Sequence, residues 1–78
     1  MTLLEKVEQI QRVDALIRRR GTGSPAELAH KLNVSERYVF KLIKMMKELG
    51  APVYFCKNRN SYCYEQEVQF AFGFVTPK

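Results

Sequence analysis

Two helix-start signals lie close together in this chain and leave little room between them. Ser24, Pro25 and Glu27 supply a serine N-cap, a proline at the first helical position and the acidic partner of a capping box. Ser35 caps a second helix. The helix that begins at Pro25 must therefore end near Asn33, after about two turns. A short helix, a tight link and a longer helix predict a helix-turn-helix.

Hydrophobic residues recur at steps of three and four in two stretches, residues 2–20 and 36–49, so each stretch is predicted to be an amphipathic helix. Gly50 ends the second of these helices, and Pro52 prevents its continuation. The apolar side of the first helix is formed by Leu3, Leu4, Val7, Ile10, Val13, Leu16 and Ile17. The inner side of the second is formed by Val39, Leu42, Ile43, Met46 and Leu49.

The first helix ends in three consecutive arginines, Arg18, Arg19 and Arg20. Cations in a last turn complement the negative end of the helix, and we expect Gly21 to take the left-handed conformation beyond them. Contact with phosphate is an equally good interpretation of the three arginines.

After Pro52 the period of the pattern changes from 3.6 to 2, which predicts a β-hairpin with a polar tip at residues 57–60. A turn centred on Asn58 and Arg59 sets Phe55 opposite Tyr62 and Val53 opposite Tyr64. Cys56 and Cys63 then lie on the other face. They form a redox switch if they are within disulfide reach, and are otherwise small surface or subunit-contact residues.

An aromatic-rich tail follows the hairpin. Val68, Phe70, Phe72 and Phe74 alternate with other residues, so the tail is either a third, C-terminal strand or a dimer contact. We therefore divide the chain into a domain of residues 1–66 and a tail of residues 67–78. The predicted fold class is mainly α with a small β-hairpin, a three-helix winged helix-turn-helix.

The chain has 78 residues, which is enough for one small domain and too few for an elaborate enzyme with a cofactor cleft. Two cysteines and one histidine make no convincing metal site. The charged first twenty residues exclude a signal peptide there, and no apolar run approaches the roughly 20 residues of a membrane helix. We expect a cytoplasmic protein with no membrane contact, no cofactor, no small-molecule site and no enzymatic activity.

The net charge of +5 is concentrated in the central residues 31–60, which hold seven lysines and arginines against two glutamates. Arg37, Lys41 and Lys44 fall on the outward arc of the helix at 36–49, with Tyr38 and Phe40 on either side of them. This basic stripe predicts contact with DNA in the major groove, where the aromatic rings can pack on thymine methyls or sugars. The alternative is an ordinary solvated face.

Two further groups of polar residues can be assigned from the sequence. Lys57 and Arg59 at the hairpin tip suit phosphate or minor-groove contact by a wing, or they keep a turn soluble. Ser24 and Glu27 are assigned to helix capping rather than to catalysis.

Three segments resemble the helix-turn-helix type 11 family, the winged domains at the start of biotin repressors and of WYL-domain and DeoR-like bacterial regulators. They are the runs at 23–29, 32–35 and 49–53, and the similarity covers about residues 3–64. The resemblance implies that the helix at 36–49 enters the major groove, that the hairpin is a wing, and that the groove-facing residues are Ser35, Arg37, Tyr38, Lys41 and Lys44.

Two departures from the family pattern matter. Leu42 stands where family members usually have a polar residue, so this position is expected to be less exposed here. The sensor or enzymatic domain that normally follows is missing from this sequence, so no response to a ligand is implied.

Together these features predict sequence-specific binding of double-stranded DNA by a small bacterial transcriptional regulator that forms a homodimer. Two alternatives stay open. One is a winged-helix protein-interaction module that uses Tyr38, Phe40 and the tail, for which Phe72→Ala should abolish binding. The other is an architectural or excision-type DNA-binding factor, which bends DNA with little sequence preference.

Overall fold

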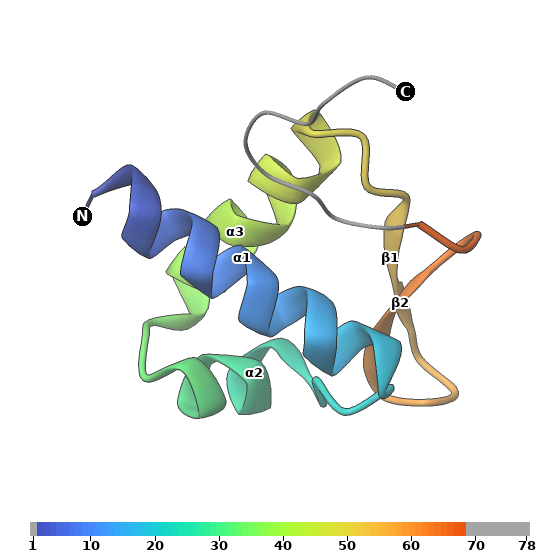
Figure 1. Cartoon of the computed structure of the whole chain (residues 1–78). Helices are drawn as coiled ribbons and strands as arrows, with labels where there is room; N and C mark the ends of the chain where they lie inside the picture. Colours follow the sequence, from blue (N-terminus) through green and yellow to red (C-terminus); the bar gives the residue numbers. More distant parts are fainter. Residues whose placement is uncertain (1, 69–78) are drawn as a thin grey trace, which may run out of the picture.

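A computed structural model of the chain describes residues 2–68. Three helices are followed by an antiparallel hairpin (Figure 1). The helices are α1 (Leu3–Arg18), α2 (Pro25–Leu32) and α3 (Glu36–Glu48), and the strands are β1 (Val53–Cys56) and β2 (Ser61–Tyr64). This is the mainly helical, winged helix-turn-helix architecture that the sequence predicted. The predicted third strand falls mostly on residues 69–78, which lie outside the described residues.

Each helix begins at a hydroxyl side chain that accepts a backbone N–H from its first turn. The Ser24 cap also has the reciprocal bond, because the Glu27 carboxylate accepts from the Ser24 N–H at 3.1 Å. The capping box is therefore confirmed. The helix caps are Thr2, Ser24 and Ser35.

All three helices end in one hydrogen-bond pattern, with a residue of positive φ just beyond the last turn. In α1 the Gly21 N–H donates to the Leu16 carbonyl at 2.8 Å, and the Arg20 N–H donates to the Ile17 carbonyl at 2.9 Å. The left-handed residues are Arg20, Asn33 and Gly50, with φ of 54°, 57° and 98°. The expectation that Gly21 takes this conformation was wrong: α1 ends at Arg18, so the reversal falls one residue earlier.

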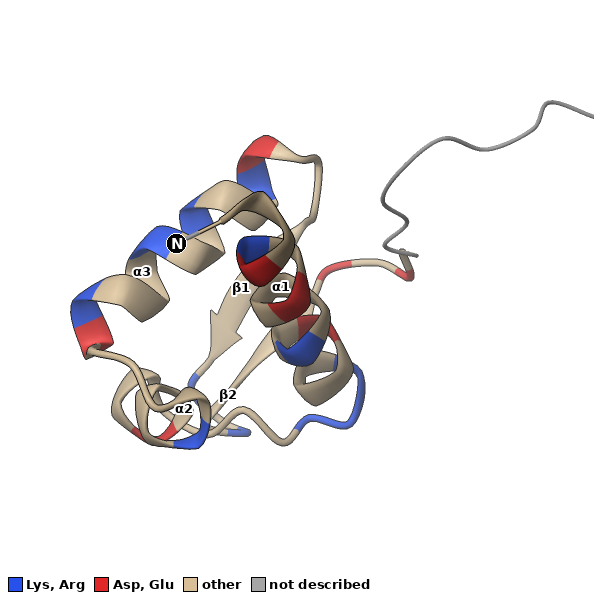
Figure 2. Ribbon diagram, turned by 60° about the vertical axis from the view of Figure 1, so that its left-hand side comes forward, with Lys and Arg blue, Asp and Glu red and all other residues tan. Residues whose placement is uncertain are grey.

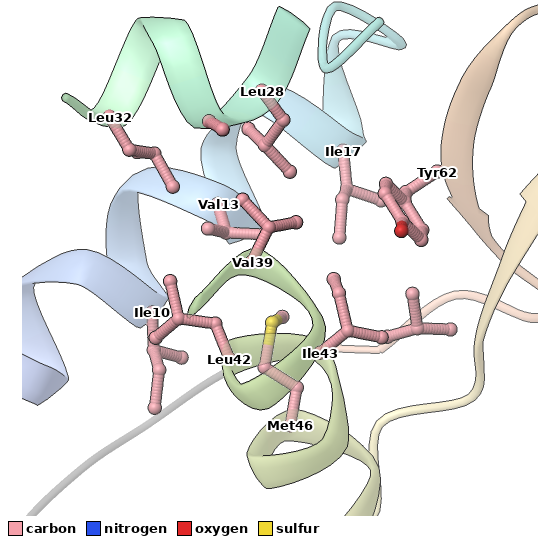
Figure 3. Packing of buried hydrophobic residues seen from close by; sticks show 12 residues of the cluster. Ile10, Val13, Ile17, Leu28, Leu32, Val39, Leu42, Ile43, Met46 and Tyr62 are labelled. Atoms are coloured by element: carbon pink, nitrogen blue, oxygen red, sulfur yellow. The ribbon is translucent and has the colours of Figure 1, made fainter. Parts of the chain in front are cut away.

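The core lies where the three helices meet the hairpin (Figure 3). Val13, Leu28, Val39 and Leu42 are fully buried there. Ile17 and Tyr62 extend the cluster from the helices to β2. Because all three helices contribute, the orientation of α3 is fixed by side chains on both of its predecessors.

Three leucines that the periodicity placed on buried faces are exposed: Leu3, Leu4 and Leu49, at 64%, 68% and 64%. The buried side of α1 begins only at Val7, since the first turn extends beyond the rest of the molecule (Figure 1). Leu49 is the C-cap residue of α3, past its last buried contact at Met46. Helical spacing identifies the apolar arc, but not how far along each helix the neighbouring elements reach.

The hairpin has the predicted register. Phe55 pairs with Tyr62, and Val53 pairs with Tyr64. The rings of Phe55 and Tyr62 meet edge to face, with centroids 5.2 Å apart. This contact joins the two strands on the face that packs on the core.

The two cysteines are free thiols on diagonal positions, because Cys56 pairs with Ser61 and Cys63 pairs with Tyr54. Diagonal Cα atoms lie about 7–8 Å apart, beyond the usual disulfide range. The register therefore argues against a redox switch. The expectation of small surface or subunit-contact residues was wrong for Cys63, which is 5% exposed, whereas Cys56 is half-buried.

Arg20 offers a direct test of the helix ending. A non-glycine residue in the left-handed region is disfavoured, so Arg20→Gly should raise the free energy of unfolding by about 0.5–1 kcal/mol. Arg19, with φ of −88°, gains nothing from the same change, so Arg19→Gly is the matched control. Urea denaturation measures both. Equal effects of the two substitutions would contradict the helix ending described here.

Candidate nucleic-acid interface

The outward face of α3 is set by what its inward face buries. Val39 and Leu42 are completely buried, and Ile43 and Met46 nearly so. With that side fixed, the opposite side carries Arg37, Lys41 and Lys44, and all three are exposed. We call these three residues the α3 ridge. Lysines and arginines follow the outer edge of α3, with a glutamate at each end (Figure 2). The expectation of low exposure at Leu42 is confirmed, since its side chain is completely buried.

The α3 ridge is electrostatically unneutralised within the part of the chain that the structure describes. The ion pair recorded there joins Arg18 to Asp14, at 3.0 Å, and none involves Arg37, Lys41 or Lys44. The guanidinium and ammonium groups of the ridge are therefore exposed to solvent, where an anion can approach them.

The other residues predicted to contact DNA at α3 and its cap differ in how far they are free to do so. The Ser35 Oγ accepts the Tyr38 N–H at 3.1 Å, so this exposed hydroxyl is already used as the helix cap. Tyr38 is half-buried and packs against the core. Phe40 is 53% exposed and does lie uncovered beside the ridge.

The hairpin is tied to the segment between α1 and α2 by buried polar groups. Thr22 is fully buried, and its Oγ accepts the Tyr62 N–H at 2.8 Å. The same Oγ lies 2.9 Å from the Ser61 Oγ. Thr22 thus supplies a hydrogen-bond acceptor to a backbone N–H of β2, in a sheet that has only two strands within the described residues.

A second tie reaches the hairpin tip. The Asn60 side-chain amide donates to the Glu27 carboxylate at 3.0 Å. The structure therefore places the tip, with exposed Lys57 and Arg59, beside the start of α2. Figure 2 shows α2 and the tip together at one end of the molecule, while the α3 ridge occupies another side. The predicted wing residues and the ridge are separate basic groups.

Arg18, the first of the three arginines, takes part in contacts within the fold. Its guanidinium pairs with Asp14, donates to the Val68 carbonyl and lies 5.9 Å from the centre of the Tyr64 ring. The Tyr64 hydroxyl donates to the Asp14 carboxylate at 2.7 Å. Burial and this carboxylate raise the pKa of Tyr64 well above its ordinary value. The cluster fastens β2 to α1.

The sequence alone did not single out Thr22, Ser61 or Asp14. A threonine between two glycines and a serine at the start of a strand are common surface patterns, so only tertiary contact reveals them. Within residues 2–68 no three histidine, cysteine, aspartate or glutamate side chains gather in a way that could hold a metal ion. No helix in these residues is both long and apolar enough to cross a membrane.

Comparisons with models of known protein families, with curated proteins and with solved structures find no match to this chain. The resemblance to the helix-turn-helix type 11 family therefore stays a prediction from three short motifs.

Thr22→Val tests how the hairpin is held. The substitution keeps the shape of the side chain but leaves the buried Tyr62 N–H without its acceptor, so the free energy of unfolding should fall by about 1–3 kcal/mol. Thr22→Ser keeps the hydroxyl and is the control, with a smaller loss. Chemical denaturation compares them. A valine variant as stable as the wild type would show that the bond contributes nothing.

Glu27 links stability to pH. Hydrogen bonds from Ser24 and Asn60 hold the pKa of the Glu27 carboxyl below its usual 4.5. The folded state favours the ionised form, so this contribution is complete above pH 4.5 and is lost as the pH falls through the lowered pKa. The difference in denaturation midpoint between wild type and Glu27→Gln should therefore shrink below pH 4.5. A constant difference from neutral pH to about pH 3 would contradict the assignment.

Proposed function

We propose that this chain binds double-stranded DNA in a sequence-specific manner, with α3 in the major groove and the hairpin as a wing. The observation that carries the proposal is the α3 ridge: three exposed cations on the outer side of the second helix of a helix-turn-helix, whose inner side is wholly buried. On this basis we infer a small bacterial transcriptional regulator, active in the cytoplasm and without enzymatic activity.

The dimensions and chemistry of the ridge suit the major groove. The groove is about 12 Å wide and accommodates one helix of ordinary diameter. Arg37 can donate two parallel hydrogen bonds to the O6 and N7 atoms of guanine, the commonest specific contact. Lys41 and Lys44 can neutralise phosphates, and the uncovered Phe40 ring can contact a thymine methyl.

A homodimer belongs to the proposal. Two copies double the number of phosphate contacts, and they read a palindrome whose half-sites lie about 34 Å apart or a multiple of that. Symmetry in the selected sequences would support the dimer, and a single unrepeated half-site would contradict it.

A second candidate is a protein-interaction module, and the 53% exposure of Phe40 is the observation that favours it. The two functions separate on substitution. Loss of Arg37 and Lys41 together should leave a protein partner bound, whereas it should abolish binding to DNA.

Salt dependence tests the DNA-binding proposal first. If one subunit neutralises about five phosphates, the logarithm of the association constant should fall against the logarithm of salt concentration with a slope near −4 to −5. Selection from a randomised duplex library followed by fluorescence anisotropy measures the sequence preference and the slope together. An affinity for duplex DNA that does not depend on salt would refute the proposal.

Arg37→Ala and Lys57→Ala should weaken DNA binding in different ways. Loss of a guanine contact should cost about 1–3 kcal/mol on the selected site and relax the sequence preference. Loss of a phosphate contact at the tip should weaken binding to all sequences alike. Competition between selected and random duplexes separates the two. If Arg37→Ala weakens all duplexes equally, Arg37 does not read bases.

A further inference from the structure

A shallow groove of about 300 Å³ lies on one flank of the α3 ridge, between α1 and α3. It is lined by Lys6 from α1 and by residues of α3, among them the two lysines of the ridge. The α3 residues are Tyr38, Lys41, Lys44, Met45 and Glu48. The groove is continuous with the ridge and extends it toward α1.

The groove is basic and its cations are unpaired among the described residues. Lys6, Lys41 and Lys44 bring three positive charges from two helices, against one carboxylate from Glu48. The structure records no lysine of this set within 4.0 Å of a carboxylate in residues 2–68. Their ammonium groups are therefore available to an anion.

The walls of the groove are also partly apolar. Met45 and Tyr38 are both half-buried and pack against the core, so the core supports their outer surfaces where they line the groove together with the lysines. A nucleotide unit of a DNA strand has the complementary composition, an apolar sugar beside a charged phosphate. The ammonium groups can contact the phosphate while the sugar lies over the methionine and the phenol ring.

The position of the groove matches that of a backbone strand. A helix that lies in the major groove has a sugar-phosphate strand along each of its flanks. With the α3 ridge directed at base edges, the α1 side of α3 faces one of these strands. Lys6 is the side chain that α1 contributes at that place.

We propose that this groove binds one sugar-phosphate unit of the strand that flanks α3, and that Lys6 contacts its phosphate. The inference rests on the proposed function and extends it. It adds Lys6 of α1 to an interface that the sequence assigned to α3 and the hairpin tip, with the three arginines at the end of the first helix as an open alternative. A phosphate held between Lys6 and the ridge also ties α1 to α3 across the groove.

Lys6→Gln tests the assignment, and Arg12→Gln is the control. Glutamine keeps part of the aliphatic stem and removes the charge, while Arg12 is an exposed cation of α1 whose guanidinium donates to the Lys31 carbonyl at 3.2 Å. With the wild-type chain and the selected duplex, Lys6→Gln should reduce the steepness of the log–log salt dependence by about 0.9. It should leave the sequence preference unchanged, and Arg12→Gln should leave the slope unchanged.

The outcomes separate this inference from the function on which it depends. If the wild type binds duplex DNA and Lys6→Gln keeps its slope, the inference is wrong and the proposed function stands. If the control variant reduces the slope of the salt dependence as much as Lys6→Gln does, Lys6 acts only through overall charge and the assignment is again wrong. A wild-type chain that does not bind duplex DNA overturns both.

A second measurement locates the contact on the DNA. Each phosphate along the flanking strand is replaced in turn by an uncharged methylphosphonate, and wild type is compared with Lys6→Gln. One replacement should weaken the wild type several-fold and have little further effect on the variant, because the pair is already broken. If every replacement weakens both proteins alike, Lys6 contacts no particular phosphate.

Discussion

Burial of one side of α3 determines which side of this helix faces solvent. Val39 and Leu42 are fully buried against the preceding helices, and the regular rotation of about 100° per residue then fixes where every other side chain of α3 points. The α3 ridge is exposed for that reason and not because its residues are charged. Leu42 lies between Lys41 and Lys44 in the sequence and is nevertheless part of the core, because its side chain falls on the inner side of the helix.

The position of the hairpin depends on a different kind of contact. Thr22 and Ser61 form a buried hydroxyl pair, and Glu27 serves both the cap of α2 and the side chain of Asn60. One short segment, residues 22–27, thereby connects the start of α2 to β2 and to the hairpin tip. Any DNA-binding surface that includes both the ridge and the tip relies on this segment for its geometry.

Local signals in the sequence were sufficient for most of the fold. Serine caps, the break at Gly50 and the change of period at Pro52 each act over a few residues, so they could be identified without tertiary information. The hairpin register followed from alternation and the length of the turn. The α3 residues of the candidate interface were predictable by the same logic, because a helix wheel needs only the spacing of its apolar side.

Features that depend on tertiary contact could not be predicted in this way. The spacing rules could not show that α1 ends before Arg20, that Leu49 lies past the reach of its neighbours, or that Cys63 is buried. The i, i+4 spacing of Asp14 and Arg18 is a local signal for their ion pair, but nothing in the sequence indicated that Tyr64 would join it. The sequence also could not show that Lys6 lines one groove with Lys41, because this depends on how α1 packs against α3.

Nuclear magnetic resonance can show whether the outer side of α3 contacts DNA, as we propose. Isotope-labelled protein is titrated with a duplex from the selected pool, and the amide and arginine side-chain signals are followed residue by residue. We expect the largest shifts between Ser35 and Lys44, with a smaller group at the hairpin tip. Shifts confined to surfaces remote from α3, or no shifts at saturating duplex, would contradict it.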